Sequence, residues 1–167
     1  MKSEIAGSNR KVLKEVENIT AHCNCQKSRT CPVDGKCQLR KVVYKAEVMN
    51  ACGDKKIYVG STGNTFKERF RTHTATLKNK DHPSSTALSK HFWKTKSEDG
   101  KNPSVKWSII GKTNATVNER FGCMVCNLER LAIAQVSPSM RLNLRNELVT
   151  ACPHFTKMFF IKPRKSG

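Results

Sequence analysis

Two strand-like runs joined by a short turn constrain the fold of this chain more than any other feature. Residues 41–49 read KVVYKAEVM and alternate in the way that a strand with one buried face does. The stretch NACGDKK at 50–56 has the composition of a turn, and KIYVGST at 56–62 reads as a second strand. The sequence therefore predicts a β-hairpin over residues 41–61.

The segments after the hairpin predict helices and one further strand. They are a helix capped by Thr65 and reaching about Asn79, a helix over about Thr86–Lys96, a strand over 104–111, a long helix from about Val117 or Cys123 to Val136, and a short helical or irregular stretch at 141–151. This order predicts an α/β fold: a small core with a three-stranded, mostly antiparallel sheet flanked by helices.

The chain divides by composition into one domain with appendages. Residues 1–22 are expected to be a helical lead-in with an amphipathic helix at 10–21, and 23–40 form a Cys-rich extension. The core is expected over 41–154, and 155–167 are a basic tail. No apolar run approaches the ~20 residues of a membrane span, and the polar start lacks the features of a signal peptide. We expect an intracellular protein with no membrane partner.

The charge of the chain indicates a polyanionic partner. There are 31 Lys and Arg residues against 13 Asp and Glu residues, which gives a formal net charge of +18. Such an excess attracts phosphate backbones, and the release of condensed counterions favours binding. The sequence therefore predicts nucleic-acid binding.

The eight cysteines of the chain indicate metal sites, since disulfides are rare in intracellular proteins. One predicted zinc set, with the spacing CxCx5Cx5C, consists of Cys23, Cys25, Cys31 and Cys37. The other, a CxxC followed by a CxH, consists of Cys123, Cys126, Cys152 and His154. Four such ligands close a structural tetrahedral site, and only Cys52 is left over.

The partition of the zinc ligands stays open at the level of sequence. Cys31 and Cys37 also fit a CCHH site with His73 and His91. A Cys-rich linker without metal, or unpaired buried thiols near the C-terminus, would have the same spacing.

A few polar residues stand at positions that suggest chemistry. Tyr44 and Tyr58 fall on the paired strands of the predicted hairpin, and Arg69 and His73 share one helix face at i and i+4. Glu129 interrupts an otherwise apolar helical stretch. Taken singly, these are ordinary strand aromatics, a solvated basic face and an exposed acid.

Together with Asn143, these residues resemble the GIY-YIG endonuclease family. The motifs that carry the resemblance are VVY at 42–44, YVG at 58–60, FKERFRTH at 66–73, LERLAI at 128–133 and LN at 142–143. Val42 and Val43 stand where the family has glycine and isoleucine, and the spacer between the tyrosines is longer than usual. The segments that resemble the endonuclease of Penelope-like retroelements are CPVDGKC at 31–37, TALSKHFW at 86–93, CMVCNLERLAIA at 123–134 and LNLRNELVTACPH at 142–154.

The resemblance implies a metal-dependent endonuclease that nicks double-stranded target DNA to prime reverse transcription. It implies Mg²⁺ or Mn²⁺ on Glu129, Arg69 on the phosphate, and Tyr44 or Tyr58 activating water with help from His73. Asn143 would hold the site by hydrogen bonding, and Tyr44, Tyr58, Arg69 and Glu129 would converge on one cleft.

The same resemblance implies partners and a location: fusion to a reverse transcriptase, contact with element RNA, and the nucleus. The alternative is a non-catalytic zinc-containing nucleic-acid-binding module, which charge and cysteines fit equally well.

Overall fold

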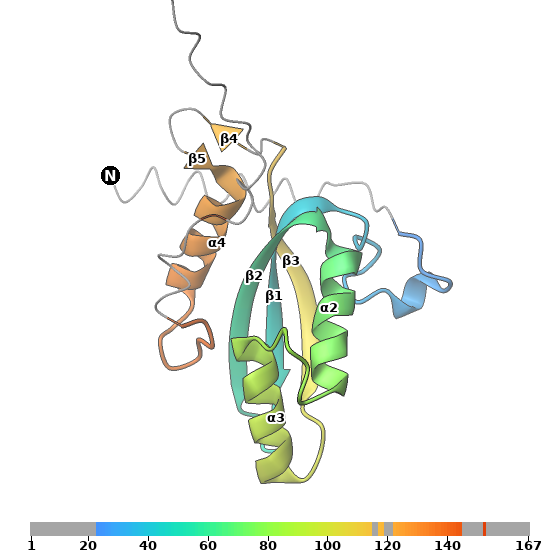
Figure 1. Cartoon of the computed structure of the whole chain (residues 1–167), viewed down its shortest axis with the longest axis vertical. Helices are drawn as coiled ribbons and strands as arrows, with labels where there is room; N and C mark the ends of the chain where they lie inside the picture. The colour runs from blue at the N-terminus through green and yellow to red at the C-terminus, as the bar shows by residue number, and fades with distance from the viewer. Residues whose placement is uncertain (1–22, 115–116, 119–121, 145–151, 153–167) are drawn as a thin grey trace, which may run out of the picture.

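The predicted hairpin provides the central strand and one edge strand of a three-stranded antiparallel sheet. The computed structural model describes residues 23–114, 117–118, 122–144 and 152. The elements along this part of the chain are η1 (Ser28–Thr30), β1 (Arg40–Met49), β2 (Lys55–Thr65), α2 (Phe66–Lys78), α3 (Ala87–Asp99), β3 (Ser104–Lys112), β4 (Val117–Asn118), β5 (Gly122–Cys123) and α4 (Met124–Gln135) (Figure 1). The predicted α/β class and antiparallel sheet are confirmed. The predicted lead-in helix and basic tail lie outside the described residues.

Strand β1 lies in the middle of the sheet, in the order β2-β1-β3. It pairs antiparallel with both neighbours, and in this register Tyr44 lies opposite Gly60 of β2. Because side chains alternate along a strand, Val42, Tyr44 and Val48 point to one face and Val43 points to the other.

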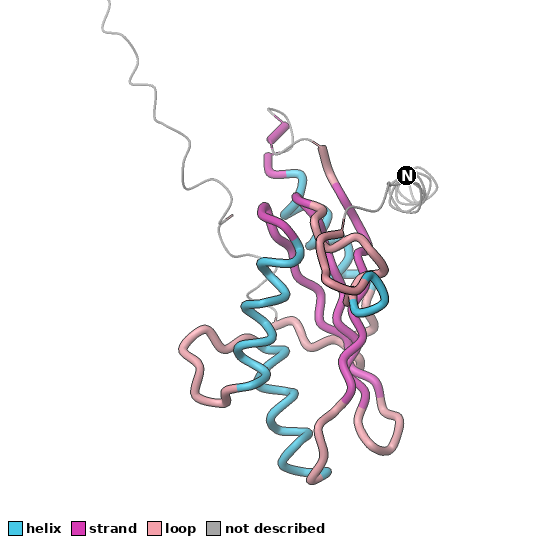
Figure 2. Tube along the Cα trace, turned by 90° about the vertical axis from the view of Figure 1, so that its right-hand side faces the viewer, coloured by secondary structure: helices cyan, strands magenta, loops and turns pink. Residues whose placement is uncertain are grey.

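Helices cover both faces of the sheet. Helices α2 and α3 lie together on one side of the sheet (Figure 2). They cover the face of Tyr44, where Phe66, Leu88 and Trp107 complete the larger hydrophobic core. Helix α4 packs on the other face, where Ile133 meets Val43 and Val59. The two cores together explain why β1 is apolar on both sides.

The helix starts follow local capping chemistry. Helix α2 begins after Thr65, whose hydroxyl accepts from the Glu68 backbone N–H while the Glu68 carboxylate accepts from the Thr65 N–H. The predicted start at Thr65 is confirmed. Helix α4 begins after Cys123, so the later of the two predicted starts is right; the small β4–β5 hairpin precedes it.

Position 60 requires a glycine because Tyr44 lies directly opposite it in the strand pair. A Cβ atom at this position would lie 2.4 Å from the Tyr44 hydroxyl oxygen and 2.6 Å from its Cζ. No side chain can occupy that space unless the tyrosine moves. A glycine inside a strand often marks such a close approach.

Replacing Gly60 by alanine should therefore destabilise the fold. Overpacking of this kind typically costs ~1–3 kcal/mol, and we expect Gly60→Ala to lower the free energy of urea unfolding by about that amount. Gly111→Ala in β3 is the matched control, because its Cβ would make ordinary contacts at 3.6 Å or more. Equal stability of the two variants would contradict the packing of Tyr44 against Gly60.

Candidate active site and metal clusters

The Tyr44 hydroxyl is the meeting point of two side chains from α2. It lies 2.7 Å from His73 Nε2, and Arg69 Nε donates a hydrogen bond to it at 3.0 Å. Tyr44 and His73 are buried, with 0% and 1% of their surfaces exposed, whereas Arg69 is half-buried. The structure thus brings three of the candidate residues into direct contact.

The start of α2 is held in place by the end of the Cys-rich segment. The backbone N–H of Phe66 donates to Leu39 O at 2.9 Å, and that of Lys67 donates to Cys37 O at 2.8 Å. These are first-turn N–H groups without a partner inside the helix. Phe66 also packs edge-on against the Tyr44 ring at 5.4 Å. The position of Arg69 and His73 therefore depends on residues 37–39 as well as on the sheet.

Burial and charge decide the protonation of the cluster. Burial, together with the positive charge of Arg69, lowers the pKa of His73 from 6.5 to about 3. Burial opposes the charge of Arg69, but electrostatic interaction and hydrogen bonding with Tyr44 and Tyr58 outweigh it and raise the pKa of the guanidinium. At neutral pH the cluster therefore holds a charged arginine beside a neutral imidazole.

The neutral imidazole can accept a hydrogen bond from the Tyr44 hydroxyl, and the guanidinium stabilises negative charge on the same oxygen. His73 Nδ1 is buried and has no hydrogen-bond partner among the described residues. Tyr58 lies beside the cluster, with its ring 5.8 Å from that of His73, and is 6% exposed. With a pKa of about 3, His73 is a weak proton acceptor, so the imidazole orients the Tyr44 hydroxyl and Arg69 is the group that favours negative charge on it.

Glu129 approaches from the other side of the sheet. It lies on α4, which packs on the face opposite α2, and its Oε2 accepts a hydrogen bond from Ser61 Oγ at 2.8 Å. Ser61 follows Gly60, so Glu129 and the tyrosine cluster meet β2 at neighbouring residues but on opposite faces. A cleft shared by Glu129 and the tyrosine cluster would have to lie at the edge of β2, because β2 stands between them.

Asn143 binds the outer edge of β2. Its Oδ1 accepts from the Val59 backbone N–H and its Nδ2 donates to Val59 O, both at 2.8 Å. Just before it, Met140 O and Leu142 N–H pair with the backbone of Ile57. The side-chain amide thus continues a short parallel pairing and holds β2 next to Gly60 and Ser61.

The sequence analysis assigned no role to Gly60, which ends the YVG motif at 58–60, or to Ser61. A glycine inside a strand-like run is a usable signal for close approach, and it would have identified Gly60. Nothing in the sequence marks Ser61, because its role depends on α4 packing against that side of β2.

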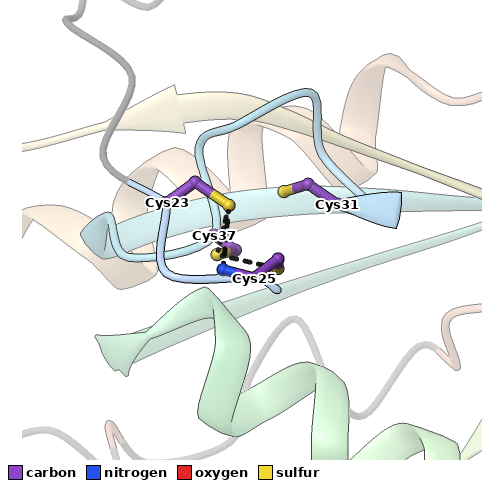
Figure 3. Close-up of side chains that lie close together, drawn as sticks. All are labelled: Cys23, Cys25, Cys31 and Cys37. Atoms are coloured by element: carbon purple, nitrogen blue, oxygen red, sulfur yellow. Dashed lines mark hydrogen bonds between the residues drawn. The ribbon is translucent and has the colours of Figure 1, made fainter. Parts of the chain in front are cut away.

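The N-terminal cysteines form a compact cluster (Figure 3). The Sγ atoms of Cys23, Cys25, Cys31 and Cys37 all lie within 4.8 Å of one another. The Cys37 Sγ is 3.6 Å from that of Cys23 and 3.8 Å from that of Cys25. A tetrahedral zinc with bonds of ~2.3 Å places its sulfurs ~3.8 Å apart. The four cysteines could therefore hold a metal such as zinc with little rearrangement.

The chemistry of these thiols fits a cation. Hydrogen bonding to Cys23, then burial and the neighbouring Cys37, raise the pKa of Cys25 to about 12. Thiols crowded in this way resist a shared negative charge unless a metal compensates it. In the alternative CCHH set, His73 and His91 would be ligands, but His73 binds Tyr44 and His91 Nε2 lies 3.4 Å from Thr95 Oγ1. The described geometry favours the four cysteines.

The second cluster lies at the start of α4. The sulfurs of Cys123, Cys126 and Cys152 lie within 4.8 Å of one another, with Cys126 and Cys152 at 3.2 Å. Burial, followed by hydrogen bonding to Cys152, raises the pKa of the Cys126 thiol. These three cysteines could also hold a metal; the predicted fourth ligand, His154, lies outside the described residues. Cys52 is exposed in the turn between β1 and β2.

We found no match to this chain among protein-family models, curated proteins or solved structures. Among the described residues, every helix is too short or too polar to span a lipid bilayer.

Zinc content should report on the N-terminal cluster. We expect Cys37→Ser to lower the zinc-to-protein ratio of the purified chain by about one ion and to lower its thermal midpoint, because one ligand of a closed four-ligand site is lost. Cys52→Ser, which alters an exposed thiol outside both clusters, is the control. Unchanged zinc content in Cys37→Ser would show that these cysteines hold no metal.

The buried neutral imidazole should make stability depend on pH. With a pKa of about 3 in the folded state and 6.5 as the ordinary value, His73 stays neutral in the fold while the unfolded chain takes up a proton below pH 6.5. Its contribution to stability is thus complete above pH 6.5 and is lost as pH falls toward 3.

Urea unfolding at a series of pH values tests this dependence. His73→Gln should be less stable than the parent at pH 7 but lose less stability between pH 6.5 and 4. His82→Asn, in the turn after α2, serves as the control variant. A His73 imidazole that titrates near 6.5 by NMR would contradict the geometry.

Proposed function

We propose that this chain is a metal-dependent DNA endonuclease of the GIY-YIG type, similar to the endonuclease of Penelope-like retroelements, and that it nicks DNA by phosphodiester hydrolysis. The observation that carries the proposal is the Tyr44 hydroxyl held between Arg69 and neutral His73 in a chain of charge +18. A purely structural tyrosine needs neither a permanent cation nor an unprotonated imidazole on its oxygen.

Hydrolysis of a phosphodiester requires a nucleophilic water, a proton acceptor and positive charge near the phosphate. Arg69 is half-buried and keeps its charge, so its guanidinium can offer hydrogen bonds to non-bridging oxygens. Its Nε donates to Tyr44, and the guanidinium also hydrogen-bonds with Tyr58, so only its remaining N–H groups can meet the substrate. Arg69 thus links the proton acceptor to the phosphate.

The proton path runs through Tyr44. Arg69 favours the phenolate form of Tyr44, whose oxygen would take a proton from the attacking water, while His73 orients that oxygen. Gly60 lies directly beside this oxygen and adds no side chain above it. Since Tyr44 is closed to solvent, substrate binding has to open a path to the hydroxyl at this point of β2. Tyr58 is the other candidate proton acceptor.

Glu129 is the residue that we propose as the ligand of the catalytic metal ion. Its carboxylate, oriented by Ser61, is an oxygen ligand of the kind that Mg²⁺ and Mn²⁺ prefer. Such an ion, when bound, would polarise the phosphate and stabilise the leaving oxygen. We place the scissile phosphate at the edge of β2 near Gly60 and Ser61, where Arg69 can reach it from one face and Glu129 from the other.

The biological setting follows from the same resemblance. We propose double-stranded DNA as the target, nicking that primes reverse transcription, fusion to a reverse transcriptase, and action in the nucleus. Element RNA is a further proposed partner. The basic tail and the rest of the Lys and Arg excess would supply most of the affinity.

A non-catalytic zinc-containing nucleic-acid-binding module is the second candidate. The complete burial of Tyr44 and the position of Glu129 across β2 favour it. Binding, however, does not require an acid beside the phosphate. The two candidates predict different effects of the same substitutions.

Nicking of supercoiled plasmid in Mg²⁺ or Mn²⁺ separates the candidates. We expect the parent to nick and a chelator to stop it. Glu129→Ala should abolish nicking with DNA affinity unchanged or slightly tighter, because one negative charge is removed. Arg69→Ala should lower the nicking rate ~10²–10³-fold, the typical cost of one fixed donor to transition-state charge.

Arg71→Ala is the matched control. Arg71 is exposed on the same helix, so its loss removes the same charge without touching Tyr44, and nicking should stay within a few-fold of the parent. Parallel gel shifts report DNA binding for all three variants. Wild-type nicking by Glu129→Ala would place the metal elsewhere. Absence of nicking by the parent in either metal would favour the binding module.

A further inference from the structure

Helix α3 carries a pocket that the site around Tyr44 does not use. Its volume is about 460 Å³, within the range of small-ligand sites, ~300–1,000 Å³. Lys80, Lys90, Lys94 and Trp93 line it, together with serines of α3 and of the turn before it. All these residues belong to residues 80–98, so one contiguous stretch of the chain builds the pocket.

We propose that this pocket binds one unpaired nucleotide of a single-stranded nucleic acid, with the base on Trp93 and the phosphates on the lysines. The proposed endonuclease activity makes DNA the expected ligand, but the binding itself rests on the pocket and not on cleavage. The pocket combines the two features of single-strand sites, an aromatic surface and positive charge along the backbone path.

Trp93 is held in a fixed orientation. Its indole Nε1 donates to Thr76 O on α2 at 3.0 Å, and Phe92 packs edge-on against it at 5.7 Å. Lys96 Nζ lies 4.6 Å from the ring centroid but does not line the pocket. The half-buried ring therefore has part of its surface free to line the pocket, already positioned for a base to stack on it.

The charge of the pocket is positive. Three lysines and one acid, Glu98, line the pocket. Lys94 Nζ lies 3.8 Å from Glu98 Oε1. Both partners of that pair are largely exposed, with 72% and 60% of their side chains accessible, so the pair is weak and Lys94 can turn to a phosphate. Lys80 and Lys90 are exposed as well.

The shape of the pocket selects an unpaired nucleotide over a duplex. The bases of a duplex are stacked on one another, and none can enter the pocket unless it is flipped out at the cost of its stacking and pairing. A duplex can place only phosphates on the rim, where Lys101, outside the pocket, would serve as well. Stacking on Trp93 should therefore distinguish single strands from duplexes.

The pocket also has a defined relation to Tyr44. Thr76, which holds the Trp93 indole, donates its hydroxyl to His73 O at 2.8 Å. Thr76 lies seven residues after Arg69, or ~10 Å along the helix at 1.5 Å per residue. The pocket and the Tyr44 cluster are thus connected through Thr76 of α2.

Fluorescence anisotropy with labelled oligonucleotides tests the pocket. The probes are a 15-nucleotide oligo(dT) and a blunt hairpin duplex of equal length, in a buffer without divalent ions. We expect Trp93→Ala to weaken oligo(dT) binding about tenfold, the middle of the range for loss of one stacked base, and to leave hairpin binding within twofold. Trp93→Phe should retain most of the single-strand affinity.

A lysine variant tests the phosphate contacts independently of folding. Lys90→Ala/Lys94→Ala alters two exposed side chains and should reduce the slope of log K against log salt for oligo(dT) by about 1.4, at ~0.7 per phosphate contact. Lys101→Ala, exposed just beyond α3, is the control and should alter single-strand binding less than either pocket variant.

Two results would overturn the proposal. One is an oligo(dT) affinity that does not change in Trp93→Ala. The other is an affinity that falls by the same factor for oligo(dT) and for the hairpin in all lysine variants. The latter would mean binding by general charge only. Trp93-dependent binding without any nicking by the parent chain would uphold the pocket and reject the endonuclease. Nicking that depends on Arg69, without binding that depends on Trp93, would uphold the endonuclease and reject the pocket.

Discussion

The hydrogen bonds on the Tyr44 hydroxyl connect the middle of the sheet to the helix that covers it. Tyr44 stands on the central strand, and its hydroxyl oxygen lies beside Gly60 of β2. The same oxygen accepts a hydrogen bond from Arg69 and is hydrogen-bonded to His73, both on α2. These polar groups meet in a buried place, where an unpaired group would be costly. The contact therefore fixes the register of β2 and the rotation of α2 together, and the burial of this place keeps His73 neutral.

The two cysteine clusters lie at the starts of the two helices that carry the candidate chemistry. Cys37 O binds the first turn of α2, and Cys123 is the residue before α4, with Cys126 in its first turn. A metal in either cluster would hold a helix start whose N–H groups need partners. A metal in these clusters would thus fix the positions of α2 and α4, and with them Arg69 and Glu129, without itself contacting a substrate.

The sequence predicted the sheet, the capped helix after Thr65 and the cysteine grouping well, because these features depend on neighbours in the chain. Alternation decides which residues of β1 share a face, and Thr65 and Glu68 form a cap within four residues. The short strands β4 and β5 were missed since two-residue strands leave no periodic signal. The pairing of Asn143 with Val59 spans 84 positions, and only the folded chain shows it.

The sequence by itself determined that Arg69 and His73 share one helix face, that the chain is strongly basic, and that four cysteines lie close enough in the chain to share a metal. Spacing along a helix and charge are local properties, so no tertiary information was needed. Only the tertiary structure decided that both α2 side chains meet Tyr44, that Gly60 must lack a side chain, and that Glu129 lies across β2 on Ser61. Strand pairing and the choice of face for each helix set these contacts, and both depend on packing between segments far apart in the chain.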